Sequence, residues 1–398
     1  MDDTATATRS PSRRLRIALV IEDVSLGGGQ ERVLAELAPR LARRHDVHLF
    51  CHTVRDLGLQ GITVRRLRAL PAPQGPRALW FTLLSSLALR PREFDVVLSQ
   101  GGNTLVQNFV LAHTVHRDRR RIRVQTQRRY GLNPAWRRAW ECVRDALFAA
   151  LERRAALRCR GRVIAVSRSV RDYFVREYGL RSDEVHIARS GVDHQVFTPD
   201  ARPQARPRIR RELGLSDADF VALFMGGLWF EKGLPDVIAA LSLTAEPSRL
   251  VVVGRGEREV FAQMAADHGV ADRVSFVPHV DRPRDYFAMA DCLVHPYPVE
   301  PFGLVVLEAA ACGLPLLAGR TGAALDLIED GVSGRFIEPQ PPDIAAGLDR
   351  LARAGDALEE MRREVHLRSL DFTWERQAQQ IEEIFLRLAP GGEGEAAR

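Results

Sequence analysis

One lysine and two glutamates in the second half of the chain have types and spacings that suit the binding of a phosphorylated sugar. Lys232 is the only lysine among 57 basic residues and stands beside Gly233, just before a helical pattern. A compact ammonium there can neutralise a diphosphate as a point charge. Glu308 lies inside the apolar run 304–311, eight residues after Glu300. A carboxylate in such a run needs a partner, which sugar or ribose hydroxyls or an arginine would supply.

Two glycine-rich turns also follow apolar runs that are expected to be strands. The first contains Gly28 and Gly29 and leads into a helical pattern, and the second contains Gly226 and Gly227. Such turns let the backbone approach a phosphate, and the N-terminus of a following helix offers free N–H groups and the positive end of its dipole. A purely structural tight turn is the alternative interpretation of the first motif, and an ordinary surface lysine at position 232 is that of the second.

Two histidines, His113 and His116, follow the apolar run 109–112. Either could orient a sugar or assist the departure of a hydroxyl proton, because histidine titrates near neutral pH. Each could equally be an ordinary polar residue. The pair lies three residues apart without a clear third ligand, so we expect neither a metal site nor a cofactor.

Short apolar runs alternate with helical patterns along the chain, which is typical of α/β folds with parallel sheets. The expected strands lie near residues 15–21, 47–51, 62–67, 94–99 and 162–167, and near 220–225, 250–253, 274–277, 292–295 and 314–318. Residues 109–112 could be strand or helix. The pattern therefore predicts two similar α/β halves.

The domain boundaries follow from composition. Pro199, Pro203 and Pro207 disfavour both helix and strand, so we place a linker at residues 199–211. It separates an N-terminal domain (1–198) from a C-terminal domain (212–370). A helical pattern at 371–389 is expected to pack back on the N-terminal domain, and a Gly/Glu/Ala tail at 390–398 to be disordered.

Composition excludes several classes of protein. No apolar run approaches the roughly 18 residues of a membrane-spanning helix, and the first apolar run is too short for a signal peptide. The five cysteines are scattered without C-x-x-C spacing, which argues against a disulfide framework or a zinc site. We therefore expect a cytoplasmic protein.

Positive charge is concentrated in one segment. Residues 117–162 hold 15 Arg and four carboxylates, a net +11, so the rest of the chain carries −5 of the total +6. Within this segment Trp136, Trp140 and further apolar residues recur every three or four positions, with Arg137 and Arg138 between them. This amphipathic pattern predicts a helix that lies on an anionic membrane surface, or a surface helix with a solvated arginine face. Nucleic acid is the weaker alternative, because the chain contains no recognised nucleic-acid module.

The second half of the chain resembles the retaining GT-B glycosyltransferases of family four, whose signature E-x(7)-E matches Glu300 and Glu308. The resemblance extends over nearly the whole chain. Further matching landmarks are Gly28 to Arg32, Val166-Ser167, Ser190 to Asp193, Lys232-Gly233, Gly254-Arg-Gly256 and Phe372-Thr-Trp-Glu. The loop 100–103 resembles lipopolysaccharide-core hexosyltransferases and favours His113, whereas Thr114-Val115-His116 resembles the commoner family pattern.

This resemblance implies a GT-B fold, in which two Rossmann-like domains face each other across a cleft, with residues 1–198 on the acceptor side and residues 212–370 binding the donor. It also implies a role for each matching residue. Lys232 would contact the donor diphosphate and stabilise charge on the leaving group, and Glu308 would bind ribose. Glu300 would hold the donor sugar, and the leaving diphosphate would help to deprotonate the acceptor without a carboxylate nucleophile. Backbone contacts would come from Gly28, Gly29, Gly226, Phe302, Gly303, Leu304 and Val305, with His279 and Val280 lining the base.

Two positions depart from the family pattern. Gly227 stands where an arginine is common, and Thr321-Gly322-Ala-Ala-Leu-Asp326 replaces a Gly-Gly-x-x-Glu motif.

The expected activity is retaining transfer of a hexose from a nucleotide sugar, UDP-linked by resemblance, to a glycolipid or an envelope polysaccharide such as lipopolysaccharide core. The expected partners are the nucleotide sugar, the glycan acceptor and the cytoplasmic face of an anionic inner membrane. The alternatives are a sugar-nucleotide epimerase and a catalytically silent subunit on the same scaffold.

Overall fold

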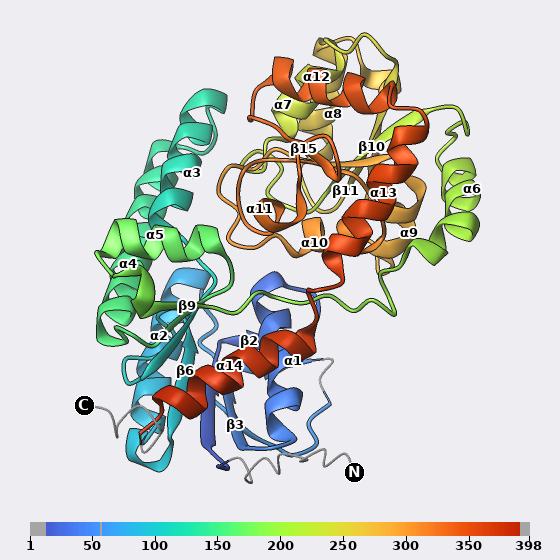
Figure 1. Cartoon of the computed structure of the whole chain (residues 1–398). Helices are drawn as coiled ribbons and strands as arrows, with labels where there is room; N and C mark the ends of the chain where they lie inside the picture. The colour runs from blue at the N-terminus through green and yellow to red at the C-terminus, as the bar shows by residue number, and fades with distance from the viewer. Residues whose placement is uncertain (1–12, 56–57, 391–398) are drawn as a thin grey trace, which may run out of the picture.

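The computed structural model describes residues 13–55 and 58–390, which form two α/β domains, each with a parallel sheet between helices (Figure 1). The N-terminal sheet has seven strands in the order β5, β3, β1, β6, β7, β8 and β9. Their bounds are β1 (Arg16–Val20), β3 (Asp46–Cys51), β5 (Ile62–Arg66), β6 (Val96–Gln100), β7 (Phe109–Ala112), β8 (Val163–Ala165) and β9 (Val185–Ile187). A separate short pair joins β2 (Asp23–Val24) and β4 (Thr53–Val54).

The C-terminal sheet has six strands in the order β12, β11, β10, β13, β14 and β15. They are β10 (Phe220–Met225), β11 (Ser248–Val253), β12 (Val274–Val277), β13 (Cys292–His295), β14 (Leu316–Ala318) and β15 (Gly334–Phe336). Each expected strand overlaps one of these elements, and the ambiguous run 109–112 is β7. The predicted fold class, two Rossmann-like α/β domains, is confirmed.

Helices cover both sheets. Those of the N-terminal domain are α1 (Gly29–Ala42), α2 (Gln74–Ala88), α3 (His116–Tyr130), α4 (Ala135–Arg158) and α5 (Arg168–Tyr178). Those that follow are α6 (Arg202–Glu212), α7 (Leu234–Leu241), α8 (Arg258–Asp267), α9 (Pro283–Met289), α10 (Leu304–Ala311), α11 (Ala324–Leu327), α12 (Pro341–Ala352), α13 (Asp356–Ser369) and α14 (Trp374–Leu388). The central strands, such as β1, β7, β10 and β13, are almost fully buried and largely apolar, as expected for parallel sheets covered on both faces. The edge strands β5 and β12 are partly exposed.

Strand order fixes where each domain can bind a ligand. In each sheet the first strand of the domain lies centrally, and the chain winds outwards from it in both directions. Ligands of such sheets bind at the carboxyl ends of the strands where the order reverses. These switch points lie between β1 and β6 and between β10 and β13, at loops that carry several of the residues singled out above.

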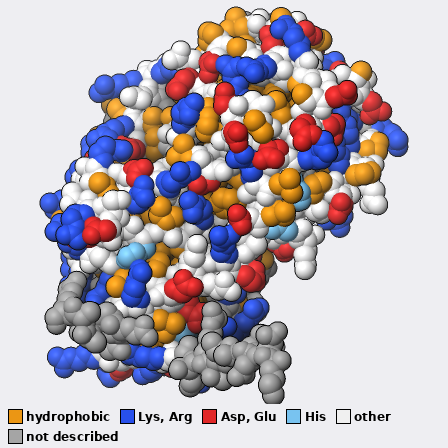
Figure 2. Space-filling view, in the orientation of Figure 1, with side chains coloured by type: hydrophobic (Ala, Val, Ile, Leu, Met, Phe, Trp, Pro, Cys, Tyr) orange, Lys and Arg blue, Asp and Glu red, His pale blue; other side chains and the backbone are white. Residues whose placement is uncertain are grey.

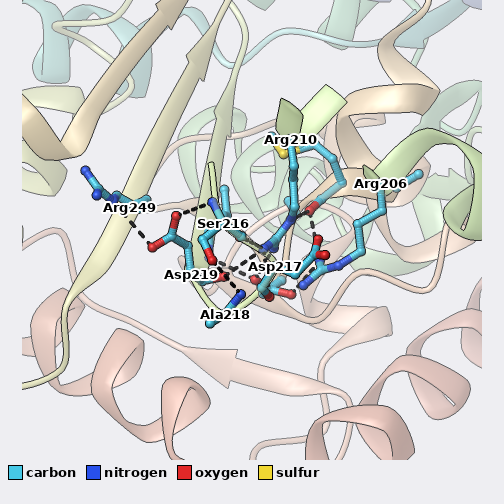
Figure 3. A network of polar contacts seen from close by, with 12 residues as sticks. Arg206, Arg210, Ser216, Asp217, Ala218, Asp219 and Arg249 are labelled. Atoms are coloured by element: carbon cyan, nitrogen blue, oxygen red, sulfur yellow. Dashed lines mark hydrogen bonds and ion pairs between the residues drawn. The ribbon is translucent and has the colours of Figure 1, made fainter. Parts of the chain in front are cut away.

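Helix α6 stands where a linker without regular structure was expected, and that part of the prediction is wrong. Pro203 occupies the first turn, where its missing N–H is not needed. Arg206 and Arg210 fix the helix to the C-terminal domain: their guanidinium groups donate to the Asp291 carboxylate at 2.9 and 2.7 Å. Arg210 also donates to the carbonyls of Ser216 and Asp219 (Figure 3). These contacts hold the helix despite Pro207 in its interior.

The chain crosses between the domains twice, and the two crossings lie side by side. The Val192 N–H donates to the Phe372 carbonyl at 3.0 Å, and Val192 forms an isolated bridge with Thr373. A Cβ on Gly191 would lie 2.2 Å from the Trp374 nitrogen, so only glycine allows this approach. After the second crossing α14 lies against the N-terminal domain (Figure 1), where Phe385 packs edge-on against Phe109 of β7.

Polar contacts also join the facing surfaces of the domains. Asp326 accepts hydrogen bonds from Arg168 at 2.6 Å and from Arg189 at 3.0 Å. Ser169 Oγ accepts from the Gly322 N–H at 2.9 Å. The altered motif 321–326 therefore forms part of the contact between the domains.

Two expectations concern the ends of the chain and the membrane. The tail expected to be disordered, 390–398, lies outside the described residues apart from Pro390. Among residues 13–55 and 58–390 no helix is long and apolar enough to cross a bilayer.

Candidate active site

The loops at the C-terminal switch point lead into two short helices that begin at glycines. The loop after β10 carries Gly226 and Lys232 and ends at Gly233, the N-cap of α7, which has a φ of 84°. The loop after β13 carries Glu300 and ends at Gly303, the N-cap of α10, with a φ of 82°. Glycine accommodates this left-handed backbone without strain. Both loops therefore turn sharply at the edge of the sheet, where they meet the N-terminal domain.

A cavity of about 470 Å³ lies between the domains at this edge, and we call it the interdomain cavity. Most of the residues predicted to bind the donor line it. They are Gly28, Gly29, Gly226, Lys232, Glu300, Phe302, Gly303, Leu304, Val305 and Glu308, together with His113. The structure thus brings together residues that lie up to 280 positions apart in the sequence.

Lys232 and Glu300, which line this cavity, form a polar cluster with His295, which is buried behind them. Lys232 Nζ lies 3.4 Å from Glu300 Oε2, and His295 Nε2 lies 3.1 Å from the same oxygen. Burial alone would raise the pKa of Glu300, but the Lys232 ammonium and the His295 hydrogen bond outweigh it and hold the pKa at about 2. Burial lowers the pKa of His295, so its neutral ring can donate from Nε2. Glu300 is therefore a fixed negative charge.

Glu308 pairs with an arginine of the other domain. Arg32 Nη1 donates to Glu308 Oε1 at 2.6 Å, across the cleft from α1 to α10. Burial raises the pKa of Glu308, and Arg32 opposes this change. Of the partners expected for this carboxylate, the structure shows the arginine. The other carboxylate oxygen, Oε2, lies outside the ion pair.

The N-termini of α1 and α10 both reach the interdomain cavity. Their N-cap residues, Gly28 and Gly303, provide no side-chain hydrogen bond to the first turn. Uncapped first-turn N–H groups and the positive ends of the two helix dipoles are available to an anion. Together with Lys232, they make this cavity suited to a phosphate group.

A second cavity, of about 250 Å³, lies within the N-terminal domain at the carboxyl ends of β1 and β6, and we call it the N-domain cavity. His113 lines both cavities, whereas His116 lines only this one. Burial lowers the pKa of His113 to about 3, so its ring is neutral. Its Nε2 is buried without a hydrogen-bond partner among the described residues. His116 packs against Phe148, and burial lowers its pKa as well.

Other predicted site residues lie elsewhere. His279 and Val280 follow β12 and line neither of these two cavities, so their contact with the base stays a prediction. The helix predicted around Trp136 to Leu157 is α4, and it exposes 73% of Trp136 and 50% of Trp140. Arg137 and Arg138 are exposed beside them. In Figure 2 basic side chains gather along the edge formed by α3, α4 and α5, where acidic side chains lie among them.

Comparisons with known proteins identify the family. The family model for glycosyl transferases group 1 matches residues 205–366, and the model for glycosyltransferase family 4 matches residues 27–196. A D-inositol 3-phosphate glycosyltransferase of Acidothermus cellulolyticus is 31% identical over 89% of this chain and 84% of its own length. The chain belongs to the group 1/family 4 glycosyltransferases.

Solved structures share the fold of this glycosyltransferase. WaaG, a glycosyltransferase involved in lipopolysaccharide biosynthesis, superposes with a TM-score of 0.75 at 18% identity, over 94% of this chain and all of WaaG. HepE from Anabaena, crystallised with UDP-glucose, gives a TM-score of 0.70 at 21% identity, over 93% of this chain and 99% of HepE. At these identities the likeness shows the fold alone.

Three residues at the candidate site have no role predicted from the sequence: Arg32 and Arg119, which line the interdomain cavity, and His295, which contacts Glu300. Arg32 lies in a motif that was recognised, but its ion pair to Glu308 joins residues 276 positions apart. Arg119 was one arginine among 15 in the basic segment. His295 carried a usable signal, because it is the last residue of a predicted parallel strand, where side chains reach the switch point.

Proposed function

We propose that this glycosyltransferase takes its sugar from a nucleoside diphosphate sugar bound in the interdomain cavity. The observation that carries the proposal is the convergence of Lys232 and the uncapped N-termini of α1 and α10 on one cavity between the domains. The diphosphate would lie against these positive groups. HepE, which has the same fold, binds UDP-glucose, and together with the family resemblance this favours a UDP-linked hexose.

The two carboxylates of the cavity would then hold hydroxyl groups. Glu308 Oε2 lies outside the Arg32 ion pair and would accept from ribose, and Glu300 would accept from the sugar. The backbone N–H groups of residues 302–305 would bind the sugar or the distal phosphate. Because both carboxylates are already paired with cations, neither is a free nucleophile. This pairing argues against a covalent glycosyl-enzyme. Retention of anomeric configuration, which the family resemblance implies, would then follow the route in which the leaving diphosphate accepts the acceptor proton on the same face of the sugar.

His113 is the better candidate of the two histidines for the reaction centre. It lies where the interdomain and N-domain cavities meet, and its unpaired Nε2 is available to a sugar hydroxyl. Because its ring is neutral, it would act as a hydrogen-bonding group and would not supply a positive charge.

For the acceptor we propose a glycolipid or envelope glycan at an anionic membrane on the cytoplasmic side. The support is α4, whose N-terminal half exposes Trp136, Trp140 and 62% of Val143 beside Arg137 and Arg138. Exposed aromatic residues among arginines suit the headgroup region of a bilayer.

Co-sedimentation with vesicles containing anionic phosphatidylglycerol should show binding. The double variant Arg137→Glu/Arg138→Glu should abolish it, with the equally exposed Arg153→Glu/Arg154→Glu as control. Absence of binding by the wild type would end this hypothesis.

A small phosphorylated polyol is a second candidate acceptor. The Acidothermus relative is named for D-inositol 3-phosphate, and the N-domain cavity is lined by Arg77, Arg119, Arg120, Arg123 and Arg144. Arginines recognise phosphate through paired hydrogen bonds. Sugar transfer from a labelled donor to inositol phosphate in the absence of lipid would favour this acceptor. Transfer that requires a lipid extract would favour the membrane acceptor.

Two measurements test the donor site against the alternatives. A thermal-shift screen with UDP, GDP, ADP and their sugars should show stabilisation by one nucleotide, as binding to the folded state requires. Lys232→Ala and Glu308→Ala should each abolish turnover by a transferase. An epimerase would convert the nucleotide sugar without any acceptor, and a silent subunit would bind no nucleotide. Either of these results would overturn the proposal.

A further inference from the structure

The charges that line the interdomain cavity leave one cation without a matching anion in it. The charged side chains are Arg32, Arg119, Lys232, Glu300 and Glu308. Arg32 is paired with Glu308 at 2.6 Å and Lys232 with Glu300 at 3.4 Å. The excess positive charge of the cavity therefore belongs to Arg119.

Arg119 projects from α3 of the N-terminal domain and is only weakly engaged. Its nearest carboxylate oxygen is Glu231 Oε2, 3.7 Å from its Nε, which is beyond hydrogen-bonding distance. Arg123 holds the other oxygen of Glu231 at 3.0 Å. The Arg119 side chain makes no hydrogen bond to the described residues, and it is 39% exposed. Its donor groups are thus available.

The position of Arg119 places these donors near Lys232. Arg119 lines the interdomain cavity, the N-domain cavity and a third cavity around Leu228 and Phe230. Tyr297 lines the interdomain cavity together with both cations. Lys232 Nζ lies 5.9 Å from its ring centre. Burial raises the pKa of the Tyr297 hydroxyl, and Arg119 is the largest influence that opposes this change. Arg119 and Lys232 therefore line one cavity from opposite domains, with Arg119 at its junction with the N-domain cavity.

We propose that Arg119 binds the distal phosphate of the donor diphosphate from the N-terminal domain, opposite Lys232. This inference rests on the proposed nucleotide-sugar donor. Because Glu300 already offsets the Lys232 charge, a diphosphate needs a further cation to be bound with its charge balanced. Gly227 lines the cavity without a side chain, although a Cβ there would have room, its nearest neighbour being the Arg255 carbonyl oxygen at 3.5 Å. Arg119 supplies the further cation for the diphosphate from the other side of the cleft.

The arrangement has a consequence for the reaction. A diphosphate held by Arg119 and Lys232 contacts both domains, so donor binding draws them together. Negative charge develops on the distal phosphate oxygen as the bond to the sugar breaks, and Arg119 stabilises it there. The same guanidinium lies beside the N-domain cavity, from which the acceptor would approach.

Titration calorimetry with UDP and UMP on the full chain tests the role of Arg119. Arg119→Gln should weaken UDP binding at least about tenfold, the effect of losing one charge-assisted hydrogen bond, and leave UMP binding unchanged. Arg119→Lys should retain part of the UDP affinity. The control is Arg128→Gln, which removes the same charge from an exposed position on α3. Arg128 lines neither the interdomain nor the N-domain cavity, so the UDP affinity of this variant should equal that of the wild type.

Two results would overturn the inference. In the first, Arg119→Gln binds UDP as tightly as the wild type does, whereas Lys232→Ala loses its affinity for UDP. The other is an equal loss of UDP and UMP affinity, which would mean that Arg119 acts only through the structure. If the wild type binds no UDP at all, the proposed UDP donor fails and not the placement of Arg119 alone. Unchanged circular dichroism and melting temperature confirm that each variant folds.

Discussion

Replacing Lys232 by methionine should cost the folded protein about 3 kcal/mol at pH 7. The pKa of Glu300 lies at about 2 instead of its ordinary 4.5, and one pKa unit corresponds to about 1.4 kcal/mol. Because burial alone would raise this pKa, the whole stabilisation comes from its partners, Lys232 first and His295 second. Methionine keeps most of the volume of lysine but leaves a buried carboxylate without its cation. Removing one partner of a buried ion pair destabilises a protein more than replacing both partners by apolar groups.

The pH dependence distinguishes this cause from loss of packing. The folded pKa of Glu300 is depressed, so its contribution is complete above about pH 4.5 and is lost as pH falls towards 2. Urea unfolding of wild type and Lys232→Met should therefore differ most at pH 7, and the difference should shrink below pH 4.5. The double variant Lys232→Met/Glu300→Gln should recover part of the loss, since it removes the unpaired charge.

Arg255 gives a matched control for this prediction. It is exposed beside the same domain cleft and makes no ion pair among the described residues. Arg255→Met should change the free energy of unfolding by less than about 0.5 kcal/mol. A Lys232→Met variant as stable as this control at pH 7, or a difference that does not change between pH 7 and pH 3, would refute the energetic account of the Lys232 and Glu300 pair.

Three further predictions follow from buried groups. Because burial holds the pKa of His113 at about 3, this residue should add no ionisation to the pH profile of kcat/KM between pH 5 and 9. A step near pH 6.5 that disappears in His113→Gln would contradict this. Glu308→Gln should weaken UDP binding about tenfold or more but leave the binding of 2′,3′-dideoxy-UDP unchanged; equal losses would exclude a ribose contact. Asp291→Asn should cost about 3 to 5 kcal/mol in urea unfolding, because four arginines share its carboxylate, with the KM for the donor unchanged. A loss below 1 kcal/mol would show that these arginines do not depend on Asp291.

Much of the fold could be read from local patterns, because parallel strands buried on both faces appear as continuous apolar runs. The run 314–318 and β14 illustrate this. The strands that escaped notice are short and partly polar, such as β15, with the sequence Gly-Arg-Phe. Their formation depends on a neighbouring strand already in place, as β15 depends on β14. Local sequence carries little information about such edge strands.

Helix α6 was not predicted for a different reason. Its prolines disfavour a helix, and the arginine contacts that stabilise it are not visible in the sequence. Arg202, Arg206 and Arg210 recur every fourth residue, which is a helical period. All three donate to carbonyl groups at the end of α9 or to Asp291. The buried face of a helix is expected to be apolar, so a repeat of arginines does not indicate one. Only the structure shows that this repeat pairs with the buried carboxylate of Asp291.

The candidate site was predictable where a motif brings its residues close in sequence, and not where the domains meet. Glu300, Gly303 and Glu308 belong to one loop and helix, and their spacing alone places them together. Arg32 and Arg119 come from the other domain, and nothing in a linear pattern indicates which of many arginines faces the cleft. The missed residues are therefore the ones that join the two halves of the site.

Arg32 shows why this join matters for the chemistry. Its guanidinium lies 5.8 Å from the ring centre of Phe197 and 5.9 Å from that of Trp374, the side chains next to the two interdomain crossings. From this place it donates to Glu308, whose pKa burial would otherwise raise further. The carboxylate that would accept the ribose hydroxyls thus depends for its charge on a side chain resting against both crossings. Because this ion pair joins α1 of one domain to α10 of the other, a movement of one domain relative to the other would change the surroundings of the Glu308 carboxylate.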